Sequence, residues 1–487
     1  MAQLDWLVLA IYAVAVLLVG FVANQKSNTE TDYFLAGRQE GWAPVAASTW
    51  ATKLSALTFI GVPGAAMSGN FAYLQLWFGS FAAAYIVAVV FIPEFYRLRV
   101  ATVYEYLAQR IGPQTRTAGT IVFIISRCLA SAVRLAGCAI AVSVFFSLSV
   151  VTAIVLISSL AAIYVLSGGL RAVIWTDVLQ LALFLAGAIV SIAFIAANLP
   201  GGFQQIIEIG NDANKFKVFD FGFGISDATT FWMGNLFALV LGVATGAADQ
   251  DIAQRALACP SPRQAKIALI TAGGADLIST FLFLSVGAAV FAYYQAMPND
   301  AVSALIAQGR YDHIFPHFIR HELPAGLRGA LIAALFAAAM SSLDSALSGL
   351  ASSAYFDLGL TQNQHRDANN IAGPRILVIV FAIILTLIAI SFGSQPSILW
   401  FGFKIMGYTY GSMLGLFLLA AFAPTYVDDR TSAASVFASI TIVVAATQWG
   451  FGMGPAPWPW AVIIGVLTTC GLAIAFSNPQ LRPKKRT

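Results

Sequence analysis

The chain has 487 residues, of which 59% are hydrophobic and only 10% are charged, and its mean hydropathy is +0.80. This composition excludes an ordinary soluble protein and leaves little sequence for a separate soluble domain. The net charge of +4 is explained by basic loops between apolar segments. We therefore expect a lipid bilayer as partner and no nucleic acid.

A membrane-spanning helix needs about 20 mostly apolar residues. By this criterion we predict an all-α polytopic membrane protein with about 13 transmembrane helices. The first, residues 5–24, contains an apolar run from Trp6 to Ala23 that follows Asp5, lacks a basic segment before it and precedes no small-residue cleavage site. We therefore interpret it as a span and not as a signal peptide. The predicted spans are 5–24, 41–68, 71–96, 117–147, 149–167, 172–199, 230–257, 267–295, 325–354, 374–394, 397–422, 432–452 and 457–477.

Lysine and arginine gather in alternate loops. Cytoplasmic loops carry an excess of these residues, so the pattern predicts a multi-pass protein of the plasma (inner) membrane with its N-terminus outside and its C-terminus in the cytoplasm. The basic loop residues are Lys26, Arg38, Arg97, Arg99, Arg110, Arg116, Arg171, Arg255, Arg263, Lys266, Arg366, Arg375, Arg430, Arg482, Lys484, Lys485 and Arg486.

Two spans are interrupted by small, polar or helix-breaking residues: TWATKLSALTFIGVPG at 49–64 and GVATGAADQD at 242–251. Corresponding interruptions in two successive blocks of five spans are typical of inverted-repeat transporters, whose unwound backbone meets substrate and ions near the membrane midplane. Alternatively, the glycines only permit close helix packing. Together, the interruptions favour one transporter domain over 1–487. It comprises an extra helix at 5–24, repeats at 41–199 and 230–422, and two C-terminal helices within 432–477.

Several charged residues fall inside predicted spans, where each costs at least about 2.5–3.5 kcal/mol and therefore needs a partner or a function. We expect Arg127 and Lys404 to reach the membrane interface along their aliphatic stems. The full set is Lys53, Arg127, Arg134, Asp177, Asp276, Asp344 and Lys404.

The segment FAAAMSSLDSALSG, residues 336–349, places polar groups within a buried helix. Ala338, Ser341, Asp344 and Ser345 recur on one helical face. Oxygen atoms converging there suit a hard monovalent cation, and the carboxylate of Asp177 could face the same cluster. Alternatively, the serines bond to carbonyls one turn back, and Asp344 caps or pairs structurally.

Six motifs in order resemble the sodium/solute symporter family over essentially the whole chain, including its bacterial sialic acid and sugar symporters. They are TDYFLAGR (31–38), ATKLSALTFIG (51–61), VYEYL (103–107), GGLRAVIWTDVLQ (168–180), DQDIAQR (249–255) and LPAGLRGALIAALFAAAMSSLDSALSG (323–349). The resemblance implies a five-plus-five inverted-repeat (LeuT-like) core. It also implies a secondary active transporter that couples inward sodium movement to solute uptake by alternating access.

The resemblance also implies cation ligands. The first sodium site would use the carbonyls of Ala51, Leu54 and Ala338 and the hydroxyls of Ser341 and Ser342. A second site, present in some members, would use Asp177, Ser341, position 344 and Ser345. Position 344 is aspartate here, where those relatives have a hydroxyl, so this site either binds a cation more strongly or is linked to a proton.

The implied substrate site departs from the family. Ala130 matches the arginine that holds the carboxylate in sialic acid symporters, and Thr58 and Trp77 replace the polar residues of sugar symporters. Lys53 and Arg134 favour a small organic anion, although Lys53 could instead pair with Asp276. A sugar, an amino acid and proton coupling remain alternatives. The predicted substrate residues are Lys53, Ser55, Thr58, Tyr73, Trp77 and Arg134.

Other functional classes are less favoured. A transporter-fold sensor would use the same residues, but no signalling domain is attached. An enzyme is disfavoured because the spans contain no nucleophile–base pair and all four histidines lie in loops. His313, His317 and His321 have a spacing that can hold zinc, but no general base or catalytic pocket accompanies them, so we interpret them as an exposed interfacial loop helix. We expect a functional monomer.

Overall fold

The computed structural model describes residues 2–24, 34–55, 57–165, 170–224, 226–359, 372–392, 398–450 and 455–478. Parts of three quoted motifs, at 31–33, 56 and 168–169, lie outside the described residues. So do Lys26, His365, Arg366 and the basic residues of the C-terminus. Within the described residues the chain is helical throughout and contains no strand, which confirms the predicted all-α class.

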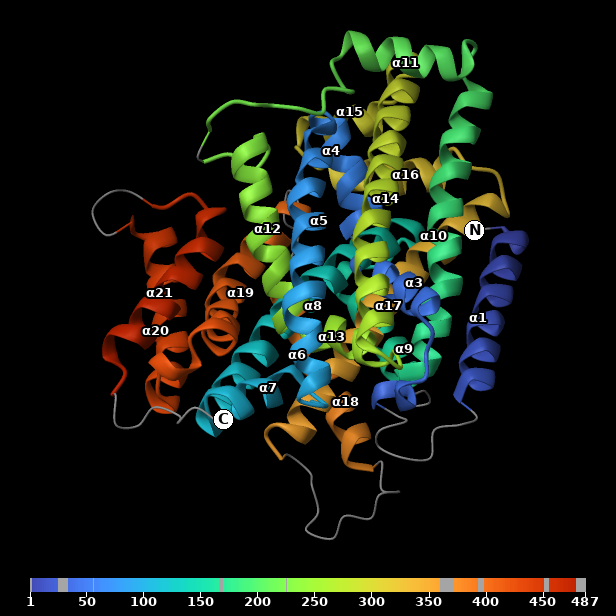
Figure 1. Ribbon diagram of the computed structural model, residues 1–487. Coiled ribbons are helices and arrows are strands. Elements are labelled where there is room, and N and C mark those ends of the chain that lie inside the picture. Colours follow the sequence, from blue (N-terminus) through green and yellow to red (C-terminus); the bar gives the residue numbers. More distant parts are fainter. Residues whose placement is uncertain are drawn as a thin grey trace.

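The first half of the chain forms a bundle of long helices with several short ones between them (Figure 1). These elements are α1 (Gln3–Asn24), η1 (Ala36–Arg38), α3 (Trp42–Lys53), η2 (Leu57–Gly61), α4 (Val62–Ser68), η3 (Phe71–Leu76), α5 (Trp77–Ile86), η4 (Val87–Phe91), α6 (Ile92–Arg97), α7 (Val103–Arg110), α8 (Pro113–Phe146), α9 (Val150–Val165) and α10 (Leu170–Asn198).

The second half adds helices to the same bundle, with α20 and α21 packed beside α19 at one side (Figure 1). These elements are α11 (Gly202–Asp212), α12 (Phe231–Ala248), α13 (Gln250–Leu257), α14 (Pro262–Ala296), α15 (Asp300–Ala307), η5 (Tyr311–His313), α16 (Ile314–His321), α17 (Leu327–Phe356), α18 (Ala372–Phe392), α19 (Ile398–Phe422), η6 (Pro424–Tyr426), α20 (Asp429–Gln448) and α21 (Trp460–Phe476).

Nine helices in the described part of the chain are long and apolar enough to cross a membrane. A tenth candidate consists of two helical pieces, Trp42–Lys53 and Thr58–Ser68, which meet at a bend of 62°. Shorter apolar helices lie at Gln3–Val19, Val150–Ala162 and Trp460–Phe476. The protein is therefore a multi-pass helical membrane protein, as the composition predicts.

The two predicted interruptions are both breaks in helical geometry. Helix α3 ends at Lys53 because Leu54 adopts an extended conformation, with φ −78° and ψ 123°. Helix α12 ends at Ala248 because Asp249 is also extended, with φ −90° and ψ 114°. Since the last four carbonyls of an α-helix have no partner within the helix, each break exposes backbone oxygen atoms inside the bundle.

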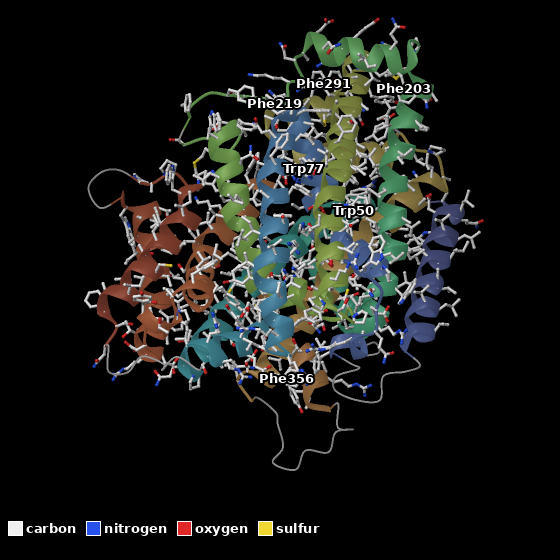
Figure 2. All side chains as sticks on the ribbon, in the orientation of Figure 1. Trp50, Trp77, Phe203, Phe219, Phe291 and Phe356 are labelled. Carbon is white, nitrogen blue, oxygen red and sulfur yellow. The ribbon has the colours of Figure 1, made fainter. Side chains whose placement is uncertain are left out.

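Close packing encloses the first break. Helix α3 packs against α10, α14 and α17, and α4 packs directly on α14. At this second contact a Cβ atom on Gly287 would lie 2.4 Å from the carbonyl oxygen of Pro63, so only glycine allows the approach. Trp50 and Trp77 lie at mid-height of the bundle (Figure 2). The first break is thus enclosed by helices inside the bundle.

Helix α1 is attached to the bundle by a buried carboxylate. Asp5 accepts hydrogen bonds from the backbone N–H groups of Gly326 (2.8 Å) and Gly329 (3.1 Å), and it pairs with Arg328 at 2.8 Å. These contacts satisfy orphan donors at the start of α17, where the positive end of the helix dipole also favours a carboxylate. Asp5 thereby joins the first helix to the helix that carries the serine cluster.

Candidate functional site: a central cavity beside two broken helices

A cavity of ≈ 240 Å³ lies between the two breaks. Its wall is formed by residues of α3, α4, α5, α8, α12, α13, α14 and α19 together with η2, η3 and η4. Five of the six predicted substrate residues line it, and Ser55 does not. The five are Lys53, Thr58, Tyr73, Trp77 and Arg134.

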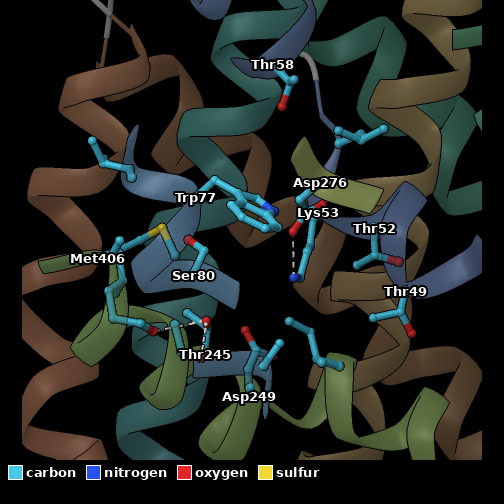
Figure 3. Close-up of a pocket in the computed structure, with 18 of the residues that line it drawn as sticks. Thr49, Thr52, Lys53, Thr58, Trp77, Ser80, Thr245, Asp249, Asp276 and Met406 are labelled. Carbon is cyan, nitrogen blue, oxygen red and sulfur yellow. Dashed lines mark hydrogen bonds and ion pairs between the residues drawn. The ribbon is translucent and has the colours of Figure 1, made fainter. Parts of the chain in front are cut away.

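Lys53 forms an ion pair with Asp276, one of the two roles that the sequence allowed for it. Its Nζ lies 2.7 Å from Oδ2 of Asp276, and the two side chains are 29% and 17% exposed. Figure 3 shows the pair beside Trp77, with Thr58 at one end of the cavity and Asp249 at the other. Both charged groups line the cavity, so internal pairing and substrate contact are compatible at this position.

Arg134 differs from Lys53 in having no carboxylate partner. Its Nη1 is buried and has no hydrogen-bond partner, and the residue takes part in no ion pair within the described residues. Arg127 lies seven residues earlier on α8, which places both arginines on one helical face toward the cavity. A buried guanidinium nitrogen without an acceptor is costly unless a ligand supplies one.

The rest of the wall combines aliphatic and hydroxyl-bearing side chains with four aromatic ones, Tyr73, Trp77, Phe237 and Phe403. Trp77 stacks on Phe81 with ring centroids 5.1 Å apart, and its indole N–H donates to the carbonyl of Gly273 at 3.0 Å. Tyr73 meets Trp400 edge to face at 5.9 Å. Phe403 lines the cavity too, and the sequence analysis missed it because an apolar residue in an apolar span carries no distinguishing signal.

Arg127 corrects one prediction. It does not reach the membrane interface: only 2% of its side chain is exposed, and it pairs with Asp249 at 3.1 Å and with Asp251. Tyr410 also donates to Asp249, at 2.9 Å. The DQD triplet at the second break was the available signal, because buried carboxylates require cations. Lys404, by contrast, is exposed on α19.

Arg255 corrects a second prediction, that this residue lies in a basic cytoplasmic loop. It belongs to α13 and is 1% exposed, so it is not part of a basic cytoplasmic loop. Its guanidinium lies 3.0 Å from Asp177 and 2.5 Å from Asp251, and it also donates to Ser345. Ser341 donates to Asp177 as well. Three of the four residues predicted for a second cation site therefore lie together, with a protein cation among them.

Asp344 is the fourth residue of that set, and it is buried without a partner. Its side chain forms no hydrogen bond or ion pair with any described residue, and Oδ1 is fully enclosed. The alternative in which Asp344 caps or pairs structurally is thus not what the structure contains. The alternative in which the serines bond to carbonyls one turn back is observed at Ser345, whose hydroxyl donates to the carbonyl of Ser341 at 2.6 Å.

The first predicted sodium site lies where α3 and α17 pack together. The hydroxyl of Ser342 is buried and has no hydrogen-bond partner among the described residues. On α3, the Trp50 carbonyl accepts the last N–H, from Leu54, so the carbonyl of Ala51 lies in the broken end of the helix. Oxygen atoms with spare acceptor capacity fit a sodium ion, which is bound through oxygen.

The histidine series does not form a metal centre. No group of three or more side chains suited to a metal ion occurs among the residues that the structure describes. His317 and His321 stack on α16 with centroids 4.4 Å apart. Burial, together with neighbouring Arg310, lowers the pKa of His313 to about 4. These residues form a packed loop helix at the end of the bundle.

Comparisons with known proteins agree with this geometry. The sodium/sialic acid symporter SiaT of Proteus mirabilis is 32% identical over 454 residues, covering 91% of this chain and 89% of the relative. NanT of Aliivibrio fischeri, also a sodium/sialic acid symporter, is 30% identical over 456 residues, covering 92% and 87%. A solved substrate-bound, outward-open Na+-coupled sialic acid symporter superposes with a TM-score of 0.87 at 28% identity, covering 100% of both chains. The profile described as "Sodium:solute symporter family" matches residues 33–429, and this chain belongs to that family.

Proposed function

We propose that this protein is a secondary active transporter that couples inward sodium movement to the uptake of a small organic anion. The observation that carries the proposal is a pair of interior charges without partners. Arg134 at the cavity and Asp344 on α17 form no ion pair among the described residues, whereas Lys53, Arg127, Asp177 and Asp276 are all paired. One unpaired charge of each sign suits an anion carried together with a cation.

Sodium would bind at the first break. Its ligands would be the carbonyls of Ala51, Leu54 and Ala338 and the hydroxyls of Ser341 and Ser342. These groups come from α3 and α17, so a bound ion would hold the broken helix against α17. Sodium would stabilise the outward-open form, substrate would allow closure, and inward opening would release both. The second cation position, around Asp177, Ser341, Asp344 and Ser345, would take a further sodium ion or a proton.

The substrate would be a small carboxylate held by Arg134. The relatives named above carry sialic acid, but Ala130 stands where their arginine is expected, and Arg134 lies one turn further along α8. The cavity of ≈ 240 Å³ is smaller than the roughly 300–1,000 Å³ of pockets for drug-sized ligands. Lys53, Ser55, Thr58, Tyr73 and Trp77 would complete the site, with the aromatic side chains packing against the apolar part of the substrate.

We propose the predicted topology for the whole chain. The bent pair and the three shorter apolar helices would complete thirteen spans, with inverted repeats at 41–199 and 230–422. Helices α11 and α15 lie at the opposite end of the bundle from α7 and α18 (Figure 1), which supports an outer and an inner face. Arg110 and Arg116 flank the start of α8 at the inner end. The protein would work as a monomer in the inner membrane, N-terminus outside.

Thermal-shift measurements on the purified protein test this function. The probes are sialic acid, pyruvate, iodide, alanine and glucose, each with sodium and with potassium. The net organic anions, sialic acid or pyruvate, should raise the unfolding temperature, and sodium should enlarge that shift, because a ligand that binds only the folded protein stabilises it. Stabilisation by glucose or alanine alone would overturn the anion assignment, and equal shifts in potassium would overturn sodium coupling. Binding without uptake into proteoliposomes would identify a sensor instead.

A further inference from the structure

The short helix α13 carries a carboxylate shared between two arginines. All eight residues of α13 are buried, and the side chain of Asp251 is 1% exposed. Its two oxygen atoms have different partners: Oδ2 accepts from Arg127, and Oδ1 lies 2.5 Å from Arg255. Asp251 is therefore a single buried group in contact with two cations that come from different parts of the bundle.

Arg127 faces the cavity. Arg127, Asp249 and Asp251 all contribute to the cavity wall, and the Nε of Arg127 is buried without a hydrogen-bond partner. This donor is available to an anion that enters the cavity beside Arg134. A substrate carboxylate would compete with the two aspartates for the Arg127 guanidinium.

Arg255 faces the serine cluster of α17. Its Nη2 pairs with Asp177 at 3.0 Å and donates to Ser345, and its Nε donates to Ser48 at 2.9 Å. Asp177 cannot offer its full charge to an incoming cation while the guanidinium occupies Oδ2. Arg255 is thus the internal competitor at the proposed second cation position.

We propose that Asp251 is a positioning residue that couples anion binding in the cavity to cation binding at Asp177; this inference rests on the proposed function. When an anion draws Arg127 toward the cavity, Asp251 loses one of its two cations and pairs more strongly with Arg255. Arg255 then holds Asp177 less tightly, and Asp177 becomes available to a cation. The coupling is positive in sign, and by linkage a bound cation must raise anion affinity by the same factor.

The arrangement of three carboxylates around two arginines keeps the free-energy cost of such a shift low. When Arg127 moves, Asp251 keeps its pair with Arg255, and Asp249 keeps hydrogen bonds from the Tyr410 hydroxyl and the Asp251 N–H. When Arg255 moves, Asp251 keeps Arg127, and Asp177 keeps hydrogen bonds from Ser48 and Ser341. Breaking a single isolated buried pair would instead leave an uncompensated charge. A network with two arrangements of similar energy is what coupling between two sites requires.

The test is the coupling factor, measured as the ratio of anion affinities with and without saturating sodium. The probe is pyruvate or sialic acid, whichever the wild-type protein binds, and the readout is thermal shift or equilibrium binding. In Asp251→Asn the carboxylate that links the arginines is lost while the volume is kept. We expect the coupling factor to fall by roughly 2-fold to 30-fold. Sodium and the anion should each still bind separately.

The matched control is Gln254→Met on the same helix. Gln254 is equally buried and donates to the carbonyl of Phe34 at 2.5 Å, outside the arginine network. This variant should unfold at a lower temperature and keep the wild-type coupling factor. An equal loss of coupling in the control would show that α13 acts only through its packing and would overturn the proposal.

A second variant decides the outcome if Asp251→Asn does not fold. Asp251→Glu keeps the charge but moves the carboxylate by one methylene, so it cannot hold both arginines in place, and coupling should again fall. An unchanged coupling factor in whichever variant folds overturns the proposed role of Asp251. If the wild-type protein binds neither probe, or binds one without any effect of sodium, the proposed function itself fails.

Discussion

The two helix breaks have the same backbone cause and opposite surroundings. At Leu54 the break ends α3, which packs against α17, and on α17 the buried hydroxyl of Ser342 has no hydrogen-bond partner among the described residues. At Asp249 the break is saturated: the carboxylate accepts from the N–H of Asp251 at 3.1 Å and meets Arg127 at 3.1 Å. An interrupted helix is therefore not in itself a binding site. It becomes one where the freed oxygen atoms lack protein partners.

The largest effect should come from the saturated break. Arg127→Met leaves two buried carboxylates without their shared cation, and removing one member of a buried ion pair typically costs about 3–5 kcal/mol. We expect a much lower yield of folded protein and a large decrease in the thermal unfolding temperature in detergent. Lys404→Met, at an exposed charge in an apolar helix, should change neither. Normal thermal stability of the Arg127 variant would show that this network is dispensable.

Substitutions at the proposed sodium site beside the Leu54 break should lower sodium affinity and leave folding intact. Ser341→Ala combined with Ser342→Ala should leave the protein folded, because Ser342 has no partner to lose and Asp177 keeps Arg255 and Ser48 when the Ser341 hydroxyl is removed. Sodium affinity, taken from the sodium dependence of uptake, should fall about 10-fold to 100-fold, since a hydrogen bond to a charged group is worth about 1.5–3 kcal/mol. Ser352→Ala, on the same helix, is the control. Wild-type sodium dependence in the double variant would rule out this placement.

Lys53 is the last residue of α3 before the break at Leu54, and its substitution should affect anion binding more than stability. Its pair with Asp276 is partly exposed, so solvent screening keeps its contribution to stability small. Lys53→Met should therefore weaken anion binding by about 10-fold, the value of one charged contact of 1.4 kcal/mol, and leave the sodium-induced thermal shift in place. Poor folding, with unchanged anion affinity in the protein that does fold, would assign Lys53 a structural role only.

The smallest effect should come from substitution of Asp344, which should change how sodium affinity depends on pH. A proton and a sodium ion would compete at this buried carboxylate, so sodium affinity should fall as pH is lowered, by at most about 10-fold per pH unit. Asp344→Ser restores the hydroxyl of the relatives and should weaken that dependence while transport continues. Asp177→Asn should be more damaging. Identical pH profiles of sodium-dependent uptake for wild type and Asp344→Ser would exclude Asp344 from a cation site.

The two breaks also show which features could be predicted from the sequence and which could not. Interruptions at Leu54 and Asp249 were visible because glycine and polar residues are rare in spans. Partners were not visible: Arg127 and Arg255 were misplaced because the pairing of a buried charge depends on how distant helices pack. Lys53 and Arg134 were expected at the substrate site and both line the cavity, but the sequence could not show that one is paired and the other is not. That distinction depends on contacts 223 residues apart, between α3 and α14.

Sodium-driven uptake into proteoliposomes tests the central claim most directly. Labelled pyruvate or sialic acid is supplied outside, with an inward gradient of sodium or an equal gradient of potassium, to wild type and to the Ser341→Ala, Ser342→Ala double variant. The account predicts accumulation above the outside concentration only for wild type and only with sodium. Equal accumulation with potassium, or by the double variant, would contradict it.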